Sequence, residues 1–246
     1  MIVAITAGGR VEGELASLIG TPVKALAPFG AGALIDPAIV AARANGAHRI
    51  VVIGGDAVAA HCGGAVDEVV PESPDGRENI RKAIATCEGE ALLLMTSDMP
   101  FVSAATLGAF LERAPAADVA LPLASAAAYE GTYPGAPPHV TRLGNERIAN
   151  GSVVYFGPGV APRVLDSAQK LFAARKSLVR MALLLGPALL ARFVCGRLEI
   201  AHVEARARTL LGIDARAVRD SAAELCFDVD TVADYRYALA HRDRAR

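Results

Sequence analysis

Three aspartates that follow apolar residues are the side chains best suited to chemistry in this sequence. The first, Asp98, ends the apolar part of Ala91–Ser103, which reads ALLLMTSDMPFVS. Such a run predicts a strand buried on both faces, and Pro100 makes the chain leave the sheet soon after the aspartate. Open α/β sheets bind their ligands at this carboxyl end of the strands. Asp98 therefore either binds a ligand or metal or caps the following helix, and the strand pattern alone favours neither.

The other two aspartates, Asp228 and Asp230, lie in Leu225–Tyr235, which reads LCFDVDTVADY. They alternate with apolar residues, so in an extended strand both carboxylates point to one face. Thr231 is then expected to cap the last helix. Two separated carboxylates that meet at a sheet edge suit Mg²⁺, which prefers one or two carboxylates together with substrate phosphates.

A glycine turn near the N-terminus is the candidate phosphate loop. It consists of Ala7-Gly8-Gly9-Arg10, directly after the strand expected over Met1–Thr6. Glycines let backbone N–H groups approach a phosphate closely, but a lone AGG without GxGxxG or a P-loop pattern favours a simple tight turn. Lys24 stands among apolar neighbours, where it either reaches that phosphate or covers apolar surface with its stem.

The elements that position these residues alternate between strand and helix as far as Val70. This order indicates a parallel sheet with right-handed crossovers, and therefore an α/β fold with a mostly parallel central sheet flanked by helices. The segment Val11–Val23 is expected to be irregular, and Leu198–Val203 is expected to be a strand. The main expected strands are Met1–Thr6, His48–Ile53, Val66–Val70, Ala91–Asp98, Asp118–Leu123 and Ser152–Phe156. The main expected helices are Leu34–Ala44, Ala57–His61, Ile80–Cys87 and Ala104–Arg113.

The whole chain, residues 1–246, is expected to form one domain. Within it, residues 124–200 differ in character and are expected to contain a small acceptor-side excursion and a helical segment. Ala124–Asn150 is rich in proline, glycine and turn signals, which predicts short hairpins, and Pro162–Leu190 is mostly helical in pattern. Excursions of this kind often carry substrate contacts.

Composition excludes several classes of protein. The net charge is −1 and aromatic residues make up 5%, so neither a nucleic-acid footprint nor a base-stacking platform is expected. The apolar stretch Leu178–Val194 is broken by charged residues, glycine and proline, which argues against a membrane span. A helical hairpin packed on the sheet is the favoured interpretation, and a membrane-surface or homodimer contact is the alternative. The four cysteines are widely spaced, the five histidines show no ligand spacing, and no leader is seen, so we expect a cytoplasmic protein with reduced thiols.

Taken together, the motifs resemble the MobA-like nucleotidyltransferase superfamily from residue 1 to about residue 240. The segments that carry the resemblance are ITAGGR, VKALAPFGAGALID, LLLMTSDMPFVS, TRLGNERIANGSVVYF and FDVDTVADY. The resemblance implies a Rossmann-like GT-A fold. It also implies the Mg²⁺-dependent transfer of a nucleoside monophosphate from a nucleoside triphosphate, with CTP or GTP favoured, to a small phosphorylated acceptor, with release of pyrophosphate.

The resemblance also implies roles for individual residues. Asp98 and Asp230 would bind the metal, with Asp228 as a weaker candidate, and Lys24 with Arg10 would neutralise the triphosphate. Nucleotide contacts are expected from the amides of Ala7, Gly8 and Gly9 and from the side chain of Asn79. The acceptor side is expected to be lined by Arg142, Asn150, Gly151, Arg175 and Lys176.

Two other functions compete with this one. The loop after Gly9 lacks the RMG sequence of the superfamily, which favours a catalytically degenerate nucleotide-binding or regulatory protein of the same fold. A Rossmann oxidoreductase is disfavoured because GxGxxG is missing and Asp56, after Gly54-Gly55, is the only candidate ribose-binding acid.

Overall fold

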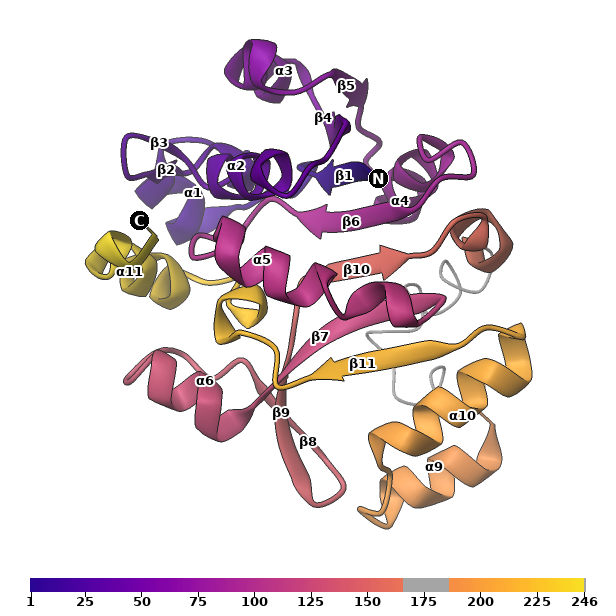
Figure 1. The fold of residues 1–246 in the computed structure, drawn as a ribbon. Coiled ribbons are helices and arrows are strands. Elements are labelled where there is room, and N and C mark those ends of the chain that lie inside the picture. Colours follow the sequence, from indigo (N-terminus) through magenta and orange to yellow (C-terminus); the bar gives the residue numbers. More distant parts are fainter. Residues whose placement is uncertain (166–185, 246) are drawn as a thin grey trace.

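The computed structural model describes residues 1–165 and 186–245, and these build one layered α/β arrangement (Figure 1). Its centre is a nine-stranded sheet in the order β5-β4-β1-β6-β10-β7-β9-β8, with β11 paired to β7. The sheet strands are β1 (Ile2–Thr6), β4 (Arg49–Gly54), β5 (Glu68–Pro71), β6 (Leu92–Thr96), β7 (Val119–Ser125), β8 (Val140–Leu143), β9 (Glu146–Asn150), β10 (Val153–Phe156) and β11 (Ala215–Arg219).

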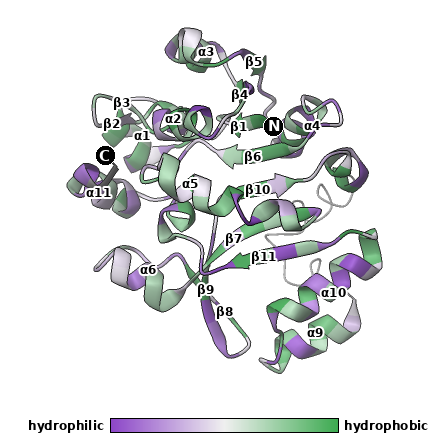
Figure 2. Cartoon of the chain, viewed as in Figure 1, coloured by the Kyte–Doolittle hydropathy of each residue, from purple (hydrophilic) through white to green (hydrophobic). Residues whose placement is uncertain are grey.

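Strands β5, β4, β1 and β6 form a parallel block. Alternate side chains of β1 enter different cores: Val3 and Ile5 belong to one apolar cluster, and Ile2 and Ala4 to another. Because both faces are covered, these strands are hydrophobic throughout, whereas the edge strand β8 is largely hydrophilic (Figure 2). The parallel block places the carboxyl ends of β1, β4, β5 and β6 along one edge.

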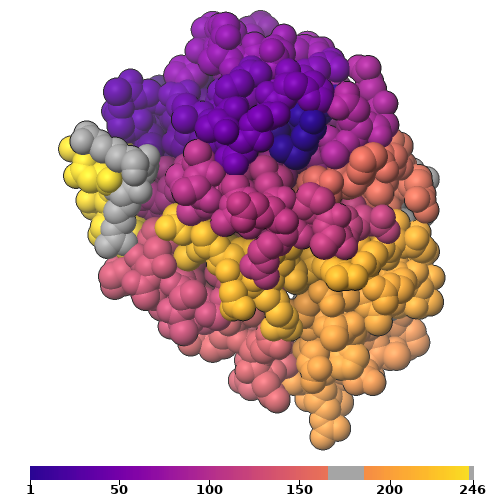
Figure 3. All heavy atoms as spheres, in the orientation of Figure 1, coloured from indigo at the N-terminus to yellow at the C-terminus, as the bar shows by residue number. Residues whose placement is uncertain are grey.

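Helices cover both faces of this block. α2 (Asp36–Ala44) and α5 (Ala104–Leu111) contact each other and lie over the face turned to the reader in Figures 1 and 3. α4 (Gly76–Ala85) packs on the opposite face, where its Ala83 and Ile84 join Ile2 and Ala4. The other described α-helices are α1 (Gly13–Ile19), α3 (Asp56–Cys62), α6 (Ala126–Thr132), α9 (Pro187–Val194), α10 (Ile200–Leu211) and α11 (Val232–Ala240).

The second half of the sheet is mixed. β10 runs antiparallel to both β6 and β7, and β9 runs antiparallel to β7 and β8, so these two strands oppose the direction of the others. The β8–β9 hairpin and α6 lie within the predicted excursion. Figure 1 shows them below the parallel block of strands, with α9 and α10 to one side.

The predicted fold class, with its mostly parallel sheet flanked by helices, is confirmed, while two local predictions are wrong. Leu198–Val203 is not a strand, because Ile200 begins α10, where Glu199 and His202 form a capping box. Val11–Val23 is not wholly irregular, because it holds the short helix α1, which ends at Gly20 in the left-handed conformation (φ 72°). The glycines and the proline near its ends made this segment look irregular in the sequence.

Candidate active site

Asp98 follows β6 at the carboxyl edge of the parallel block. The residue is 6% exposed, and its backbone oxygen accepts a hydrogen bond from the Val229 amide at 3.0 Å. Its Oδ1 is buried and has no hydrogen-bond partner among the described residues. A buried carboxylate oxygen without a donor is costly, so this atom is suited to a cation or ligand donor.

An aromatic contact brings the Asp98 segment to the C-terminal aspartates. Phe101, after Asp98, packs edge-on against Phe227, before Asp228, with ring centroids 4.9 Å apart. Both rings are almost fully buried, and such pairs contribute about 0.5–1.5 kcal/mol beyond their buried area. The Phe101–Phe227 contact and the Asp98–Val229 hydrogen bond therefore join two segments that are far apart in the sequence.

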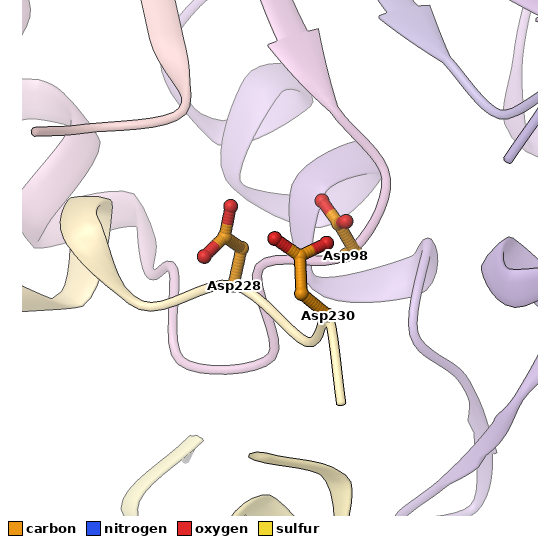
Figure 4. Close-up of side chains that lie close together, drawn as sticks. All are labelled: Asp98, Asp228 and Asp230. Atoms are coloured by element: carbon orange, nitrogen blue, oxygen red, sulfur yellow. The ribbon is translucent and has the colours of Figure 1, made fainter. Parts of the chain in front are cut away.

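The three aspartates Asp98, Asp228 and Asp230 form a cluster of carboxylates (Figure 4). One carboxylate oxygen from each lies within 4.8 Å of the others. Asp228 and Asp230 come from the extended segment before α11, and Figure 4 shows their carboxylates rising on the same side of the chain, beside Asp98. We refer to these three residues as the aspartate cluster.

Lys24 supplies a cation to the aspartate cluster. It begins a short 3₁₀ helix, Lys24–Leu26, and its Nζ forms an ion pair with Asp98 Oδ2 and a 2.8 Å ion pair with Asp230 Oδ1. Burial lowers the pKa of Lys24, but the charge of Asp98 and the hydrogen bonds that the ammonium donates to both carboxylates outweigh burial and raise the pKa above its ordinary value. The ammonium therefore stays charged and neutralises part of the cluster.

His139 is a site residue that the sequence pattern missed. Its Nδ1 lies 3.0 Å from Asp228 Oδ1, and its Nε2 lies 2.9 Å from Asp234 Oδ1. Hydrogen bonds to Asp228 and then Asp234 raise the pKa of His139 to about 10, against the opposing effect of burial. The sequence pattern did not indicate His139, since none of the histidines has ligand spacing and its partners come from nearly 100 residues away.

The glycine turn lies beside Lys24. The Gly9 carbonyl accepts a 3.0 Å hydrogen bond from the Lys24 amide, and the Arg10 guanidinium forms an ion pair with Glu72, after β5. A Cβ on Gly8 would lie 2.5 Å from Glu72 Oε2, a buried oxygen without a hydrogen-bond partner among the described residues. Glu72 is therefore a second residue that the sequence missed, because no motif surrounds it.

The Ala7 amide and the Asn79 side chain already form hydrogen bonds within the protein. The Ala7 amide donates to the Ile53 carbonyl at 2.8 Å, so it completes the sheet and is not available to a nucleotide. The Asn79 Oδ1 accepts a hydrogen bond from the Ser73 amide, and its Nδ2 donates to the Ser73 carbonyl. These two hydrogen bonds hold the loop before α4 in place. The expected amide contact thus shifts to Gly8 and Gly9, and Asn79 supports their surroundings.

The residues expected on the acceptor side are spread out. Arg142 lies on β8 and donates to the Gly144 carbonyl, and Asn150 is exposed at the end of β9. Gly151 follows, and its amide donates to the Pro122 carbonyl at 3.0 Å. Arg175 and Lys176 lie outside the described residues.

The aspartate cluster fits a divalent cation. Its donors are carboxylate oxygens, the ligands preferred by Mg²⁺ and related hard cations, and Asp98 Oδ1 has no other partner in the described part of the chain. Four carboxylates, those of the cluster and Asp234, are paired with only Lys24 and His139 in the described structure. The carboxylates therefore outnumber the two cations, which favours the binding of a further cation.

The structure is an α/β fold with a cluster of carboxylates, a lysine and a glycine turn at the carboxyl edge of its parallel block. Residues 3–211 match the family model described as the MobA-like NTP transferase domain. The chain therefore belongs to the MobA-like NTP transferase family and is a transferase of nucleotidyl groups, as the resemblance predicted.

Solved structures with similar folds extend this comparison. A hypothetical transferase from Thermus thermophilus is 27% identical, with a TM-score of 0.82 and coverage of 95% of this chain and 98% of its own. The 2-C-methyl-D-erythritol 4-phosphate cytidylyltransferase from the same species is 16% identical, with a TM-score of 0.57 and 98% coverage of both chains. Rv0371c from Mycobacterium tuberculosis H37Rv, solved with manganese, is 19% identical, with a TM-score of 0.53 and 97% coverage of both chains.

No curated protein matches the sequence significantly. Among the described residues, no helix combines the length and apolar character that crossing a membrane requires.

Proposed function

We propose that this protein transfers a nucleoside monophosphate from a nucleoside triphosphate to a small phosphorylated acceptor and releases pyrophosphate. The observation that carries the proposal is the meeting of Asp98, Asp228 and Asp230 beside Lys24 and the glycine turn. This edge of the sheet offers carboxylates for a metal, a cation for phosphate, and glycines that let a nucleotide approach the backbone. Such transfers depend mainly on positioning and charge neutralisation.

Asp98 and Asp230 are the metal ligands we propose, with Asp228 joining them through the oxygen that faces the cluster. When bound there, Mg²⁺ supplies charge neutralisation for phosphate oxygens. Manganese in Rv0371c supports a divalent cation in this fold.

Lys24 and the glycine turn act on the triphosphate. The Lys24 ammonium leaves its carboxylate partners for a phosphate oxygen, and the Gly8 and Gly9 amides donate to the nucleotide. An oxygen of the acceptor phosphate then forms a bond to the α-phosphorus as the bond to pyrophosphate breaks. This oxygen is already ionised, so the reaction needs no strong general base.

Glu72 supports CTP or GTP as the donor. Its buried Oε2 lies against Gly8 and lacks a donor within the described structure. Cytosine, guanine and adenine carry an exocyclic amino group that can donate to a carboxylate, and uracil and thymine have none, so this contact favours CTP and GTP over UTP and TTP without separating them from ATP. A cytidylyltransferase among the structural neighbours agrees with this base class.

Pyrophosphate release tests the proposed activity. The purified protein is incubated with Mg²⁺, each of the four nucleoside triphosphates in turn, and a set of phosphorylated sugars and alcohols. We expect release with CTP or GTP and one acceptor class. Binding of nucleotide without release in any combination would instead support the degenerate nucleotide-binding protein.

Calorimetric titration of nucleotide into wild-type and Asp98→Ala proteins tests the metal assignment. We expect Mg²⁺-dependent binding in the wild type and its loss in the variant; metal-independent binding, equal in both proteins, would remove Asp98 from the site. Asp230→Asn is expected to be milder than Asp230→Ala, since an amide oxygen can still ligate. If Asp228→Ala loses the activity that Asp230→Ala keeps, the second ligand is Asp228.

Two properties of the whole chain complete the proposal. All four cysteines are free, which supports a cytoplasmic location, where thiols stay reduced.

A homodimer is proposed through the apolar residues of α9, where Phe193 and Val194 are exposed. Analytical ultracentrifugation tests it, with Val194→Asp expected to yield monomers.

A further inference from the structure

His139 lies in the excursion, just before β8, yet its imidazole reaches the C-terminal aspartates. The side chain is 16% exposed. It packs among aromatic rings, with centroid distances of 5.3 Å to Phe227 and 6.0 Å to Tyr129. These contacts fix the ring in one place, so its two nitrogens have defined partners.

Both ring nitrogens face carboxylate oxygens, so both carry hydrogen and donate. Nδ1 donates to Asp228 Oδ1, and Nε2 donates to Asp234 Oδ1. Asp228 Oδ2 in turn accepts from the Ser152 hydroxyl at 3.1 Å. The orientation of the Asp228 carboxylate is thus set from two sides, by residues outside its own segment.

Asp234 extends the same network to Asp230. Its Oδ2 accepts the Asp230 amide at 3.2 Å, the Thr231 amide at 2.7 Å and the Thr231 hydroxyl at 2.7 Å. The Asp234 residue is 1% exposed. His139 therefore touches one member of the aspartate cluster directly and reaches the backbone of another through a buried carboxylate.

We propose that His139 is a positioning residue that holds Asp228, and through Asp234 the backbone of Asp230, in the arrangement that binds a divalent cation. This inference rests on the metal site of the proposed function. Residues that hydrogen-bond metal ligands in this way usually matter: losing one costs about 10- to 100-fold in metal affinity or activity.

Titration of the purified, nucleotide-free protein with Mn²⁺ alone tests the inference without relying on turnover. Three variants separate the two hydrogen bonds of the imidazole. The amide nitrogen of His139→Asn falls near the position of Nδ1 and can still donate to Asp228. That of His139→Gln falls near Nε2 and can still donate to Asp234, and His139→Ala keeps neither bond.

We expect His139→Ala to bind Mn²⁺ about 10- to 100-fold more weakly than the wild type. His139→Asn should retain more affinity than His139→Gln. His61→Asn is the matched control, because His61 also pairs with an aspartate, Asp36, at 2.7 Å, but on α3. It should leave Mn²⁺ affinity unchanged, and thermal melting of all variants reports stability separately.

Several results would overturn the inference. Wild-type affinity in a folded His139→Ala protein would show that the imidazole does not position the cluster. Better affinity in His139→Gln than in His139→Asn, or failure of all three variants to fold, would leave His139 only a structural role. A wild type that binds no Mn²⁺ removes the metal site and this inference together, whereas Mn²⁺ binding without pyrophosphate release in any combination removes the proposed activity alone.

Discussion

The Lys24 ammonium lies between Asp98 and Asp230 and contacts carboxylate oxygens that are also candidate metal ligands. Its Nζ pairs with both carboxylates, and its side chain is only 16% exposed. A divalent cation that binds the same oxygens must displace this ammonium, which is then free for a phosphate. At the scale of single residues, the same lysine is therefore expected to oppose metal binding and to favour nucleotide binding.

Lys24→Met tests this double role, since methionine keeps much of the apolar stem. Removing one partner of a largely buried ion pair leaves carboxylates uncompensated, which costs about 3 kcal/mol. We expect a lower melting temperature, tighter Mn²⁺ binding in the absence of nucleotide, and weaker nucleotide binding. Calorimetry and melting with and without Mn²⁺ measure all three, and Mn²⁺ affinity no higher than that of the wild type would contradict the displacement.

Gly8 and Gly9 differ in what an added methyl group would meet. A Cβ on Gly8 would lie 2.5 Å from Glu72 Oε2, while a Cβ on Gly9 would lie 3.4 Å from Lys24 Cε, an ordinary contact. The Glu72 oxygen is the end of a flexible side chain and can move away, and the Asn79 Nδ2, at 3.0 Å from the added Cβ, needs to shift only slightly. Gly8→Ala should therefore disturb the nucleotide contacts more than the fold.

We expect Gly8→Ala to weaken nucleotide binding about tenfold, or about 1.4 kcal/mol, with a near wild-type melting temperature. Gly64→Ala is the control, because a Cβ there meets no atom within 4 Å, and it should bind nucleotide as the wild type does. Fluorescence titration with a labelled nucleotide measures both. Equal affinities in the two variants would show that Glu72 lies outside the nucleotide site.

At the scale of elements, the N-terminus of α11 connects helix stability to the aspartate cluster. Thr231 caps α11, and its hydroxyl and amide donate to Asp234. Ser103 caps α5 in a similar capping box, with Thr106 as its partner. The two caps are chemically alike, but only the α11 cap shares a residue with the His139 network.

Thr231→Ala and Ser103→Ala are each expected to cost about 1 kcal/mol of stability. In a chain of this size, that loss lowers the melting temperature by about 2–4 °C. Only Thr231→Ala should also weaken Mn²⁺ binding, because Asp234 loses a donor. Equal Mn²⁺ affinities in the two variants would mean that the cap and the cluster are independent.

At the scale of the whole molecule, the cores decide which thiols are accessible. Cys62, Cys87 and Cys226 are buried, and Cys195, after α9, is exposed. Burial raises the pKa of the Cys226 thiol to about 12 and also raises the pKa of Cys62. The thiolate is the reactive form, so burial and pKa protect these thiols together.

A thiol reagent at pH 8 is therefore expected to modify one cysteine rapidly in the native protein and all four after denaturation. Cys195→Ser should remove the rapid reaction and leave the others. Mass spectrometry of the modified protein identifies the site. Rapid modification of Cys226 would contradict the packing of its segment against the aromatic core.

The sequence by itself determined the strands of the parallel block, since β1, β4 and β6 are apolar runs long enough to be recognised locally. It also indicated Asp98, Lys24 and Asp230 as candidates, because each lies in a motif of the MobA-like family. The local sequence pattern predicted the secondary structure less well where capping and tertiary packing decided it. Short α1 was therefore missed, and the start of α10 was expected to be a strand.

Only the tertiary structure decided which of these residues meet. The order of strands places Asp98 beside a segment that begins 130 residues later, and Phe101 packing on Phe227 holds the two together. His139 and Glu72 acquire their partners only through this packing, so no spacing in the sequence could reveal them. Hydrogen bonds and ion pairs between distant segments depend on loop closure and sheet order, which local periodicity does not encode.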